Sequence, residues 1–381
     1  MKKIYLFIFC LAFASCTPIR KLYVKYGAAK PMLDKRNDGI TRIFFDRYGT
    51  LYPDIGIDDN DIMNNDSNLY RLFANHPDLL KTACQTHLLP DNSSADDLQQ
   101  KLIDDISSLL NDKARDKKVV ILIHGFNKHP QQPVDSNSVE EFRLMREKII
   151  AFNTDGNFHF VEIYWDGCTW ANGSEIALIK GVNSAKIWNN AQAASNLVGT
   201  QLRRILEKIG NDNTVIITHS LGAGVITTAL FNVDKFSLNK QDNFFRQKVW
   251  KAYEAYPTPV RKFRVGMLAA AIPGKNTFDE YLCRTPQDNG VRDNYYFVLG
   301  YNTNDIIITK WLFAHKFGST TLGSRLDEVR ATNIILKNFG VREIDPVSFS
   351  ISNGKQQTQH AFSAYIANTG AMDTFLTKVF Q

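Results

Sequence analysis

Ser220 has the residue type and the surroundings of a nucleophile. It lies in TVIITHSLGAGVI (214–226), where a β-branched run ends and a second apolar run begins. This pattern predicts a strand that turns sharply into a helix, a turn whose usual signature is G-x-S-x-G, with Thr218 here at the first Gly position. Such a turn would place the Ser220 hydroxyl at the carboxyl edge of a sheet, where a helix N-terminus favours developing negative charge. The alternative is a serine in an ordinary strand–helix connection.

An acid and a base follow Ser220 along the chain. Asp305 comes after the apolar run NYYFVLGY (294–301), in a loop that opens an expected helix, and His360 lies in GKQQTQHAFSAYI (354–366). The alternative role for Asp305 is to cap that helix, and we expect one aspartate not to fill both roles. His315 is the rival base, but it lies on an expected helix before the last strand. His219 should point away from its neighbour at such a turn.

A second loop could stabilise an oxyanion. His124, Gly125 and Phe126 follow the apolar run KVVILI (118–123). The backbone N–H groups of Phe126 and Leu221 would donate to the oxyanion, and removing one such donor typically costs about 10²–10³ in rate. The side chain of His124 is expected to hydrogen-bond the loop. Together these residues predict acyl transfer, with His360 taking the proton of Ser220 and a later water hydrolysing the acyl-enzyme.

The elements that would position these residues alternate along the chain from residue 118 onward. Alternation of strands and helices predicts an α/β fold with a doubly wound, mostly parallel sheet. The expected strands are 118–125, 158–165, 214–220, 263–271, 294–301 and either 332–338 or 346–352, and the expected helices include 137–152, 185–210 and 361–379.

The order serine, acid, histidine is that of the α/β-hydrolases. Residues 118 to 381 resemble the lipase- and esterase-like members of this superfamily. The stretches VVILIHGFN, VEIYWDG and THSLGAG are similar to an uncharacterised bacterial branch of it, which includes lipoproteins. The resemblance implies a sheet of the α/β-hydrolase type and a serine hydrolase acting on a carboxylic ester, with lipid esters included. A peptidase or acyltransferase with the same triad is one alternative, and an inactive envelope binding protein is another.

The N-terminal residues predict export. MKKIYLFIFCLAFASC carries two lysines and an apolar run too short to cross a bilayer, so residues 1–15 are expected to be a signal peptide. The ending FASC is similar to the lipobox of bacterial lipoproteins. We expect Cys16 to be lipidated and to anchor the protein to a membrane of the cell envelope, with ordinary cleavage after Ala14 as the alternative. Residues 16–30 would be a tether.

Residues 31–115 are expected to form an N-terminal extension made of a hairpin plus a helix, ahead of a hydrolase domain over 116–381. Asp46, in FFDRYGTLYPD (44–54), resembles the nucleophile of haloacid-dehalogenase-type hydrolases, but a hairpin that turns at Tyr48-Gly49 is favoured. The acidic stretch 54–66 lacks the Gly and Glu of a calcium loop. Residues 97–111 have the spacing of an amphipathic helix. The aromatic-rich segment 231–262 is either a cap over the site or a helix packed on the body.

Composition excludes some classes of function. The net charge of +6, or 6 − 2 = +4 without Lys2 and Lys3 of the expected signal, is too small and too scattered to predict nucleic-acid binding. No C-x-x-C spacing or His/Cys cluster indicates a metal site, and we expect neither a metal nor a cofactor. Three cysteines remain after Cys16 (Cys84, Cys168 and Cys283), an odd number that leaves any disulfide pairing open.

Overall fold

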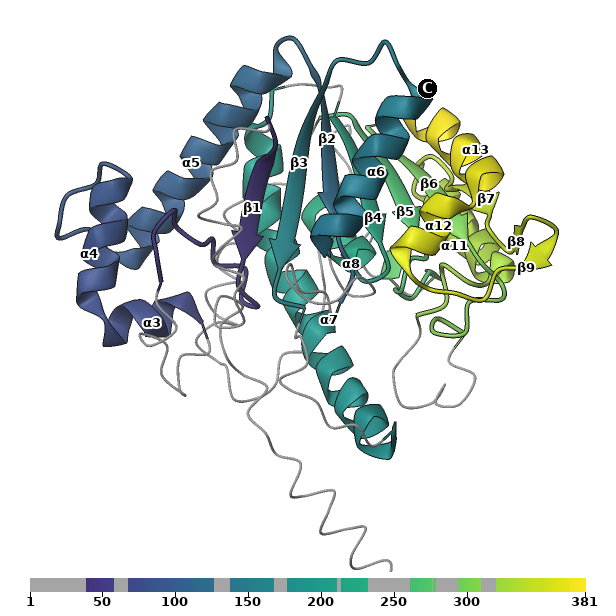
Figure 1. Ribbon diagram of the computed structural model, residues 1–381, viewed down its shortest axis with the longest axis horizontal. Helices are drawn as coiled ribbons and strands as arrows, with labels where there is room; N and C mark the ends of the chain where they lie inside the picture. The colour runs from purple at the N-terminus through teal and green to yellow at the C-terminus, as the bar shows by residue number, and fades with distance from the viewer. Residues whose placement is uncertain are drawn as a thin grey trace, which may run out of the picture.

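A seven-stranded parallel sheet forms the centre of the protein (Figure 1). The computed structural model describes residues 39–57, 68–126, 138–167, 177–210, 214–231, 261–275, 277–278, 294–309 and 320–381. The strand order is β1-β3-β2-β4-β5-β6-β7, and all neighbours are parallel. The strands are β1 (Thr41–Phe45), β2 (Lys118–Ile123), β3 (Phe158–Trp165), β4 (Thr214–His219), β5 (Phe263–Leu268), β6 (Tyr295–Tyr301) and β7 (Asp345–Ser348). The predicted α/β fold class with a doubly wound sheet is confirmed.

Helices cover both faces of the sheet. The helices α6 (Ser138–Phe152), α12 (Phe362–Ala367) and α13 (Thr369–Phe380) contact one another on one face, in front of the strands in Figure 1. The long helix α7 (Ala177–Lys208) packs on α8 (Gly222–Leu230) and on α5 (Ala95–Ala114) behind the sheet. The other helices within the described residues are α3 (Leu69–Asn75), α4 (Pro77–Thr86) and α11 (Leu326–Asn338). Central strands buried on both faces are therefore largely apolar, as KVVILI is after Lys118 and TVIITH is between its two threonines.

Three predicted elements differ in detail. The late strand comes from the second of the two candidates, because β7 begins at Asp345 whereas residues 332–338 lie in α11. The buried residues of α11 (Val329, Thr332, Ile335 and Leu336) recur at spacings of three and four, which is helical periodicity. The expected final helix is divided into α12 and α13 at Asn368, and α7 begins earlier than the predicted residue 185.

The predicted hairpin around Tyr48-Gly49 is only partly formed. The turn is present, with Gly49 at a φ of +79° and the Asp46 N–H donating to Thr50 O at 2.9 Å. Its first arm, however, is β1, which pairs in parallel with β3 as an edge strand of the main sheet. The return arm makes one antiparallel bridge, between Phe45 and Leu51. The apolar side chains of this arm are buried against the sheet, and not within a hairpin that stands alone.

The direction of winding reverses between β2 and β4. The chain moves from β2 outward to β3, then returns past β2 to β4 and continues through β5, β6 and β7. The carboxyl ends of β2 and β4 are therefore adjacent at a topological switch point, which is where open α/β sheets bind ligands. The residues that follow these two ends are 124–126 and 220–221.

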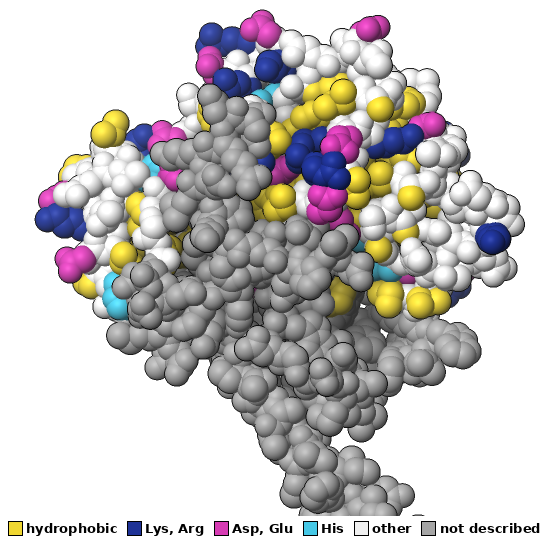
Figure 2. Space-filling model, viewed as in Figure 1, with side chains coloured by type: hydrophobic (Ala, Val, Ile, Leu, Met, Phe, Trp, Pro, Cys, Tyr) yellow, Lys and Arg dark blue, Asp and Glu magenta, His cyan; other side chains and the backbone are white. Residues whose placement is uncertain are grey.

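Several expectations concern residues outside the described ranges. These are the signal peptide and tether, Cys16, Cys168, Cys283, His315, most of the acidic stretch 54–66 and most of the segment 231–262. Among the described helices, none has both the length and the apolar character needed to cross a bilayer. Side chains of both charge signs are intermixed on the face seen in Figure 2. Helix α6 also carries an ion pair between Arg143 and Glu140.

Candidate active site

Ser220 occupies a strained turn between β4 and α8. Its φ is +53°, in the left-handed region that residues other than Gly rarely adopt. The strain is held by two backbone hydrogen bonds to the segment that ends β5: the Ser220 N–H donates to Leu268 O at 2.9 Å, and the Ala271 N–H donates to Ser220 O at 3.1 Å. A strained residue persists where the surrounding structure over-determines it, and such residues cluster at functional sites. The turn predicted from the sequence around Ser220 therefore has the sharp backbone of a nucleophile elbow.

The loop after β2 lies directly against this turn. A Cβ atom on Gly125 would be 2.8 Å from the Cβ of Ser220, and one on Gly222 would be 2.8 Å from the backbone oxygens of Ile123 and His124. Both positions thus require glycine, because β2 and α8 approach too closely for a side chain. This approach puts Phe126, the residue after Gly125, next to the Ser220 turn.

Leu221 is the N-cap residue of α8. Its N–H lies at the beginning of the helix, where backbone donors have no partner within the helix. The two segments expected to carry oxyanion donors, at Phe126 and Leu221, therefore flank the same serine.

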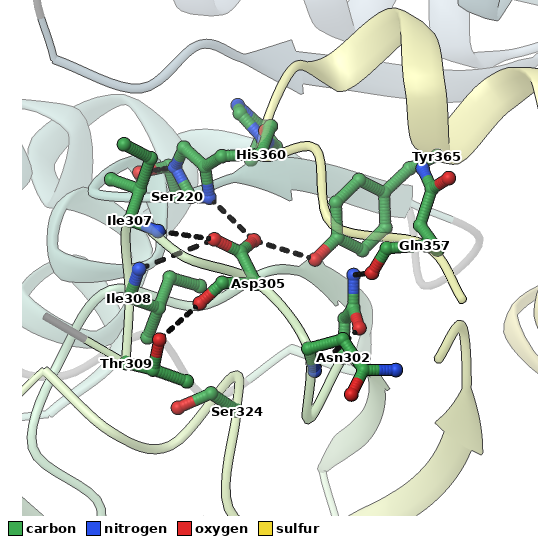
Figure 3. A network of polar contacts seen from close by, with 12 residues as sticks. Ser220, Asn302, Asp305, Ile307, Ile308, Thr309, Ser324, Gln357, His360 and Tyr365 are labelled. Carbon is green, nitrogen blue, oxygen red and sulfur yellow. Dashed lines mark hydrogen bonds and ion pairs between the residues drawn. The ribbon is translucent and has the colours of Figure 1, made fainter. Parts of the chain in front are cut away.

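The ring of His360 lies between Ser220 and Asp305. The Nε2 atom is 2.8 Å from Ser220 Oγ, and the Nδ1 atom is 2.7 Å from Asp305 Oδ2 (Figure 3). A carboxylate can only accept, so Nδ1 carries a proton, and Nε2 is left to accept from the Ser220 hydroxyl. The three residues singled out from the sequence meet in one hydrogen-bonded chain, although they are 140 and 55 positions apart.

The Asp305 carboxylate contacts both the ring of His360 and the backbone that follows it. Its Oδ1 atom accepts from the backbone N–H groups of Ile307 at 3.0 Å and Ile308 at 3.2 Å, which fixes the turn that follows. Its Oδ2 atom accepts from His360 and from the hydroxyl of Tyr365 at 2.9 Å. A carboxylate has two oxygens and about four acceptor sites, so one side chain serves the backbone and the imidazole at once.

These partners keep Asp305 charged although it is buried. Burial alone would raise its pKa, but the adjacent His360 and the hydrogen bonds from His360, Ile308 and Tyr365 together lower the pKa below its usual value. Asp305 has no exposed surface, and Ser220 is 2% exposed. The Ser–His–Asp chain therefore lies in an environment of low dielectric, where charge interactions are stronger than in water.

His124 has a structural role, as its sequence position suggested. Its Nε2 atom accepts from the Trp165 N–H at 3.1 Å, and its Nδ1 atom is 2.6 Å from Gly125 O. An N–H can only donate and a carbonyl can only accept, so the ring is the neutral Nδ1–H tautomer. The Trp165 indole N–H also donates to His124 O at 2.9 Å. The side chain thus shapes the loop that carries Phe126.

Two residues of the site were not identified from the sequence as part of it. Tyr365, which lies in α12, donates to Asp305, and the ring of His219 turns away from Ser220 so that its Nε2 atom is 2.8 Å from His360 O. The orientation of His219 agrees with the elbow geometry expected for it. The sequence pattern does not distinguish Tyr365 from a core residue, because Phe362, Tyr365 and Ile366 have the spacing of an ordinary apolar helix face.

Asp46 is the alternative nucleophile considered from the sequence, and both of its carboxylate oxygens accept hydrogen bonds from backbone N–H groups. Its Oδ1 atom accepts from the N–H groups of Tyr48 and Thr50, and its Oδ2 atom accepts from that of Leu69 at the start of α3. Burial raises the pKa of Asp46 to about 6 despite these hydrogen bonds. This carboxylate therefore fixes the turn after β1 and the beginning of α3.

Within the described ranges, no three His, Cys, Asp or Glu side chains are grouped so that they could hold a metal ion. Cys84 is buried and unpaired.

Comparisons with known proteins give no independent assignment. The chain matches no protein-family model, and no curated protein is significantly similar to it in sequence.

Proposed function

We propose that the protein is a serine hydrolase of the α/β-hydrolase type, which cleaves a carboxylic ester through an acyl-enzyme. The observation that carries the proposal is the chain from Ser220 Oγ through the His360 ring to Asp305 Oδ2, with contacts of 2.8 and 2.7 Å. Nucleophile and base within hydrogen-bonding reach, with the base oriented by a third group, are the signature of nucleophilic catalysis. The strained φ of Ser220 and the location at the switch point support the same reading.

In the proposed reaction, His360 Nε2 takes the proton of the Ser220 hydroxyl as Oγ attacks the ester carbonyl carbon. The negative charge that forms on the carbonyl oxygen is stabilised by the N–H groups of Phe126 and Leu221. Asp305 holds the imidazole in the required tautomer and stabilises its positive charge. The imidazolium then gives its proton to the leaving alkoxide, which departs as the alcohol. A water molecule attacks the acyl-enzyme by the same route, and this step releases the acid and restores Ser220.

Labelling with a fluorophosphonate tests the activated serine. We expect one covalent adduct by intact mass on the wild type and none on Ser220→Ala. A matched control is Ser195→Ala, because Ser195 is also buried but lies in α7 and donates to Gln192 O, and this variant should label like the wild type. A wild type that stays unlabelled under conditions where it is folded would overturn the proposal. It would favour the inactive binding protein considered from the sequence.

The triad itself does not encode the bond that is cut, so the substrate class needs its own measurement. A labelled protein should hydrolyse p-nitrophenyl esters, and a series of increasing acyl length would identify a preference for lipid esters. Release of peptide fragments without ester turnover would identify a peptidase. Transfer of the acyl group to an added alcohol in preference to water would identify an acyltransferase.

The proposal includes a location in the cell envelope, with the chain attached to a membrane through lipid on Cys16. The support is the short apolar run followed by FASC at the N-terminus. Cys16→Ser should move the protein from the membrane fraction to the soluble fraction of the producing cell. Equal membrane association of wild type and variant would contradict the anchor and would leave the proposed chemistry unaffected.

A further inference from the structure

His219 connects the nucleophile turn to the loop that carries the base. It is the last residue of β4, is 2% exposed, and directly precedes Ser220. Its Nε2 atom is 2.8 Å from the backbone oxygen of His360. A carbonyl oxygen can only accept, so Nε2 carries a proton and donates it. The residue beside the nucleophile therefore holds the main chain of the residue that supplies the base.

The ring of His219 is held in place by its neighbours. It stacks on Phe362 with a centroid distance of 5.0 Å and an interplanar angle of 12°, and its centroid is 4.9 Å from that of His360. Packing alone would explain a buried aromatic residue at this position. The hydrogen bond to His360 O needs a donor as well, which a purely apolar ring lacks.

The loop of His360 has two other anchors of this kind, and both come from the side of the acid. Asn302 Nδ2 donates to Gln357 O at 2.9 Å, and the Ile306 N–H lies 3.5 Å from Thr358 O. Among the contacts described for the loop backbone, the His219 hydrogen bond is thus the link from the nucleophile side. The position of the imidazole relative to Ser220 Oγ depends on that link.

We propose that His219 is a positioning residue, which sets the distance between His360 Nε2 and Ser220 Oγ by holding His360 O. This inference rests on the proposed function, because it assigns a role within the same reaction. A donor lost from this site would let the His360 loop shift away from Ser220, and a displacement of about 1 Å at a reacting group can cost about 10²-fold in rate. Because His219 would act through the position of His360, the loss should appear in kcat and not in KM.

Three substitutions separate the donor from the packing. His219→Phe keeps a stacked ring and removes the donor, whereas His219→Gln removes the ring and places an amide N–H near the position of Nε2. His219→Asn carries the same amide one methylene shorter, so its N–H falls short of His360 O. We expect the Phe and Asn variants to lose about 10–100-fold in the rate constant of fluorophosphonate labelling and in kcat, and the Gln variant to remain within about 5-fold of the wild type.

The order of the variants decides the question. If His219 acts only by packing, the Phe variant will be at least as fast as the Gln variant, and that result would overturn the inference while leaving the proposed function intact. Should the Phe variant fail to fold, as judged by its urea midpoint, equal rates for Gln and Asn would overturn the inference in the same way. A wild type that shows neither labelling nor turnover would remove the proposed function and this inference together. Ser220→Ala, which should not label, is the negative control for the labelling rates.

Discussion

Replacing Asp305 by Asn tests the reasoning about the site most directly, because the four partners of the carboxylate determine how the amide must lie. Two of them, the backbone N–H groups of Ile307 and Ile308, can only donate, and both point at Oδ1. The other two, His360 Nδ1 and the Tyr365 hydroxyl, face Oδ2 and can exchange donor and acceptor roles. The amide oxygen should therefore take the Oδ1 side, and the amide NH₂ should face His360.

The opposite orientation is unfavourable by an amount that can be bounded. It would turn the NH₂ group toward two N–H donors, of which that of Ile308 is buried and would be left unsatisfied, at a cost of about 1–3 kcal/mol. With the amide facing Nδ1, the His360 ring must accept there and carry its proton on Nε2. That tautomer cannot take a proton from Ser220. Such a change of tautomer lowers turnover by about 10⁴-fold, or about 5.5 kcal/mol in the barrier.

The assay is the rate constant of fluorophosphonate labelling, with kcat on an ester where one is turned over. Asp46→Asn is a matched control, since Asp46 is also buried at the carboxyl end of a strand and also binds two backbone N–H groups through one oxygen. It should lose stability but label at the rate of the wild type. A folded Asp305→Asn protein that labels within 10-fold of the wild type would refute the assignment of Asp305 as the acid of the site.

Three further predictions follow from other contacts. Gly125→Ala should slow labelling by about 10² or more. Its Cβ would lie 2.8 Å from Ser220 Cβ and would displace the loop that carries the Phe126 donor. An unchanged labelling rate would contradict that close contact. Arg203→Met should lower the free energy of unfolding, measured in urea, by about 3 kcal/mol or more. The reason is that Arg203 is fully buried and donates to three backbone oxygens at the end of α8, those of Thr228, Ala229 and Phe231. A loss below 1 kcal/mol would contradict this role of Arg203. The third concerns His159, whose pKa is lowered to about 4, chiefly by burial and also by Lys117 and Lys113. The unfolded chain takes up this proton near pH 6.5 and the folded protein does not, so stability should fall as the pH drops from about 6.5 toward 4, by up to about 3 kcal/mol, and His159→Gln should remove that part of the pH dependence in urea titrations.

The central strands and the helices between them could be predicted because their burial leaves a strong pattern. A strand buried on both faces is a short, largely apolar run. β2 and β4 have that form, and β3 has it apart from His159 and Glu162. The same reasoning is weaker at the edges of the sheet. In β1, Thr41 and Arg42 are only partly buried, and the same residues could equally form a local hairpin. The pairing of β1 with β3 is a long-range contact that the local sequence pattern does not predict.

The residues of the site likewise differ in how well the sequence predicts them. Ser220, Asp305 and His360 could be chosen because each follows a predicted strand, and parallel strands bring their carboxyl ends to one edge. Tyr365 and His219 could not be assigned to the site, because their roles depend on which atom faces which partner. The sequence places Tyr365 on an apolar helix face, and only the position of α12 turns its hydroxyl toward Asp305. A residue of mixed character, with an apolar body and a polar tip, is ambiguous in this respect until its neighbours are known.

The segment after β5 explains how the Ser220 turn and the strand that leads to Asp305 are held at a fixed separation. Leu268 O and the Ala271 N–H bind the backbone of Ser220 on one side, while the Ala269 N–H donates to Gly300 O at 2.9 Å on β6, the strand that leads to Asp305. Ala269 has a φ of +51°, so this segment contains a second strained residue that is not glycine, adjacent to the first.

Strain of this kind is retained only where several contacts impose it together. Residues 269–271 therefore act as a rigid spacer between the Ser220 turn and the end of β6. The loop of His360 is the separately held member of the site, because it is joined to this frame through the hydrogen bonds from His219 and Asn302. The distance from Ser220 Oγ to His360 Nε2 is consequently the one that substitutions outside Ser220, His360 and Asp305 should alter first.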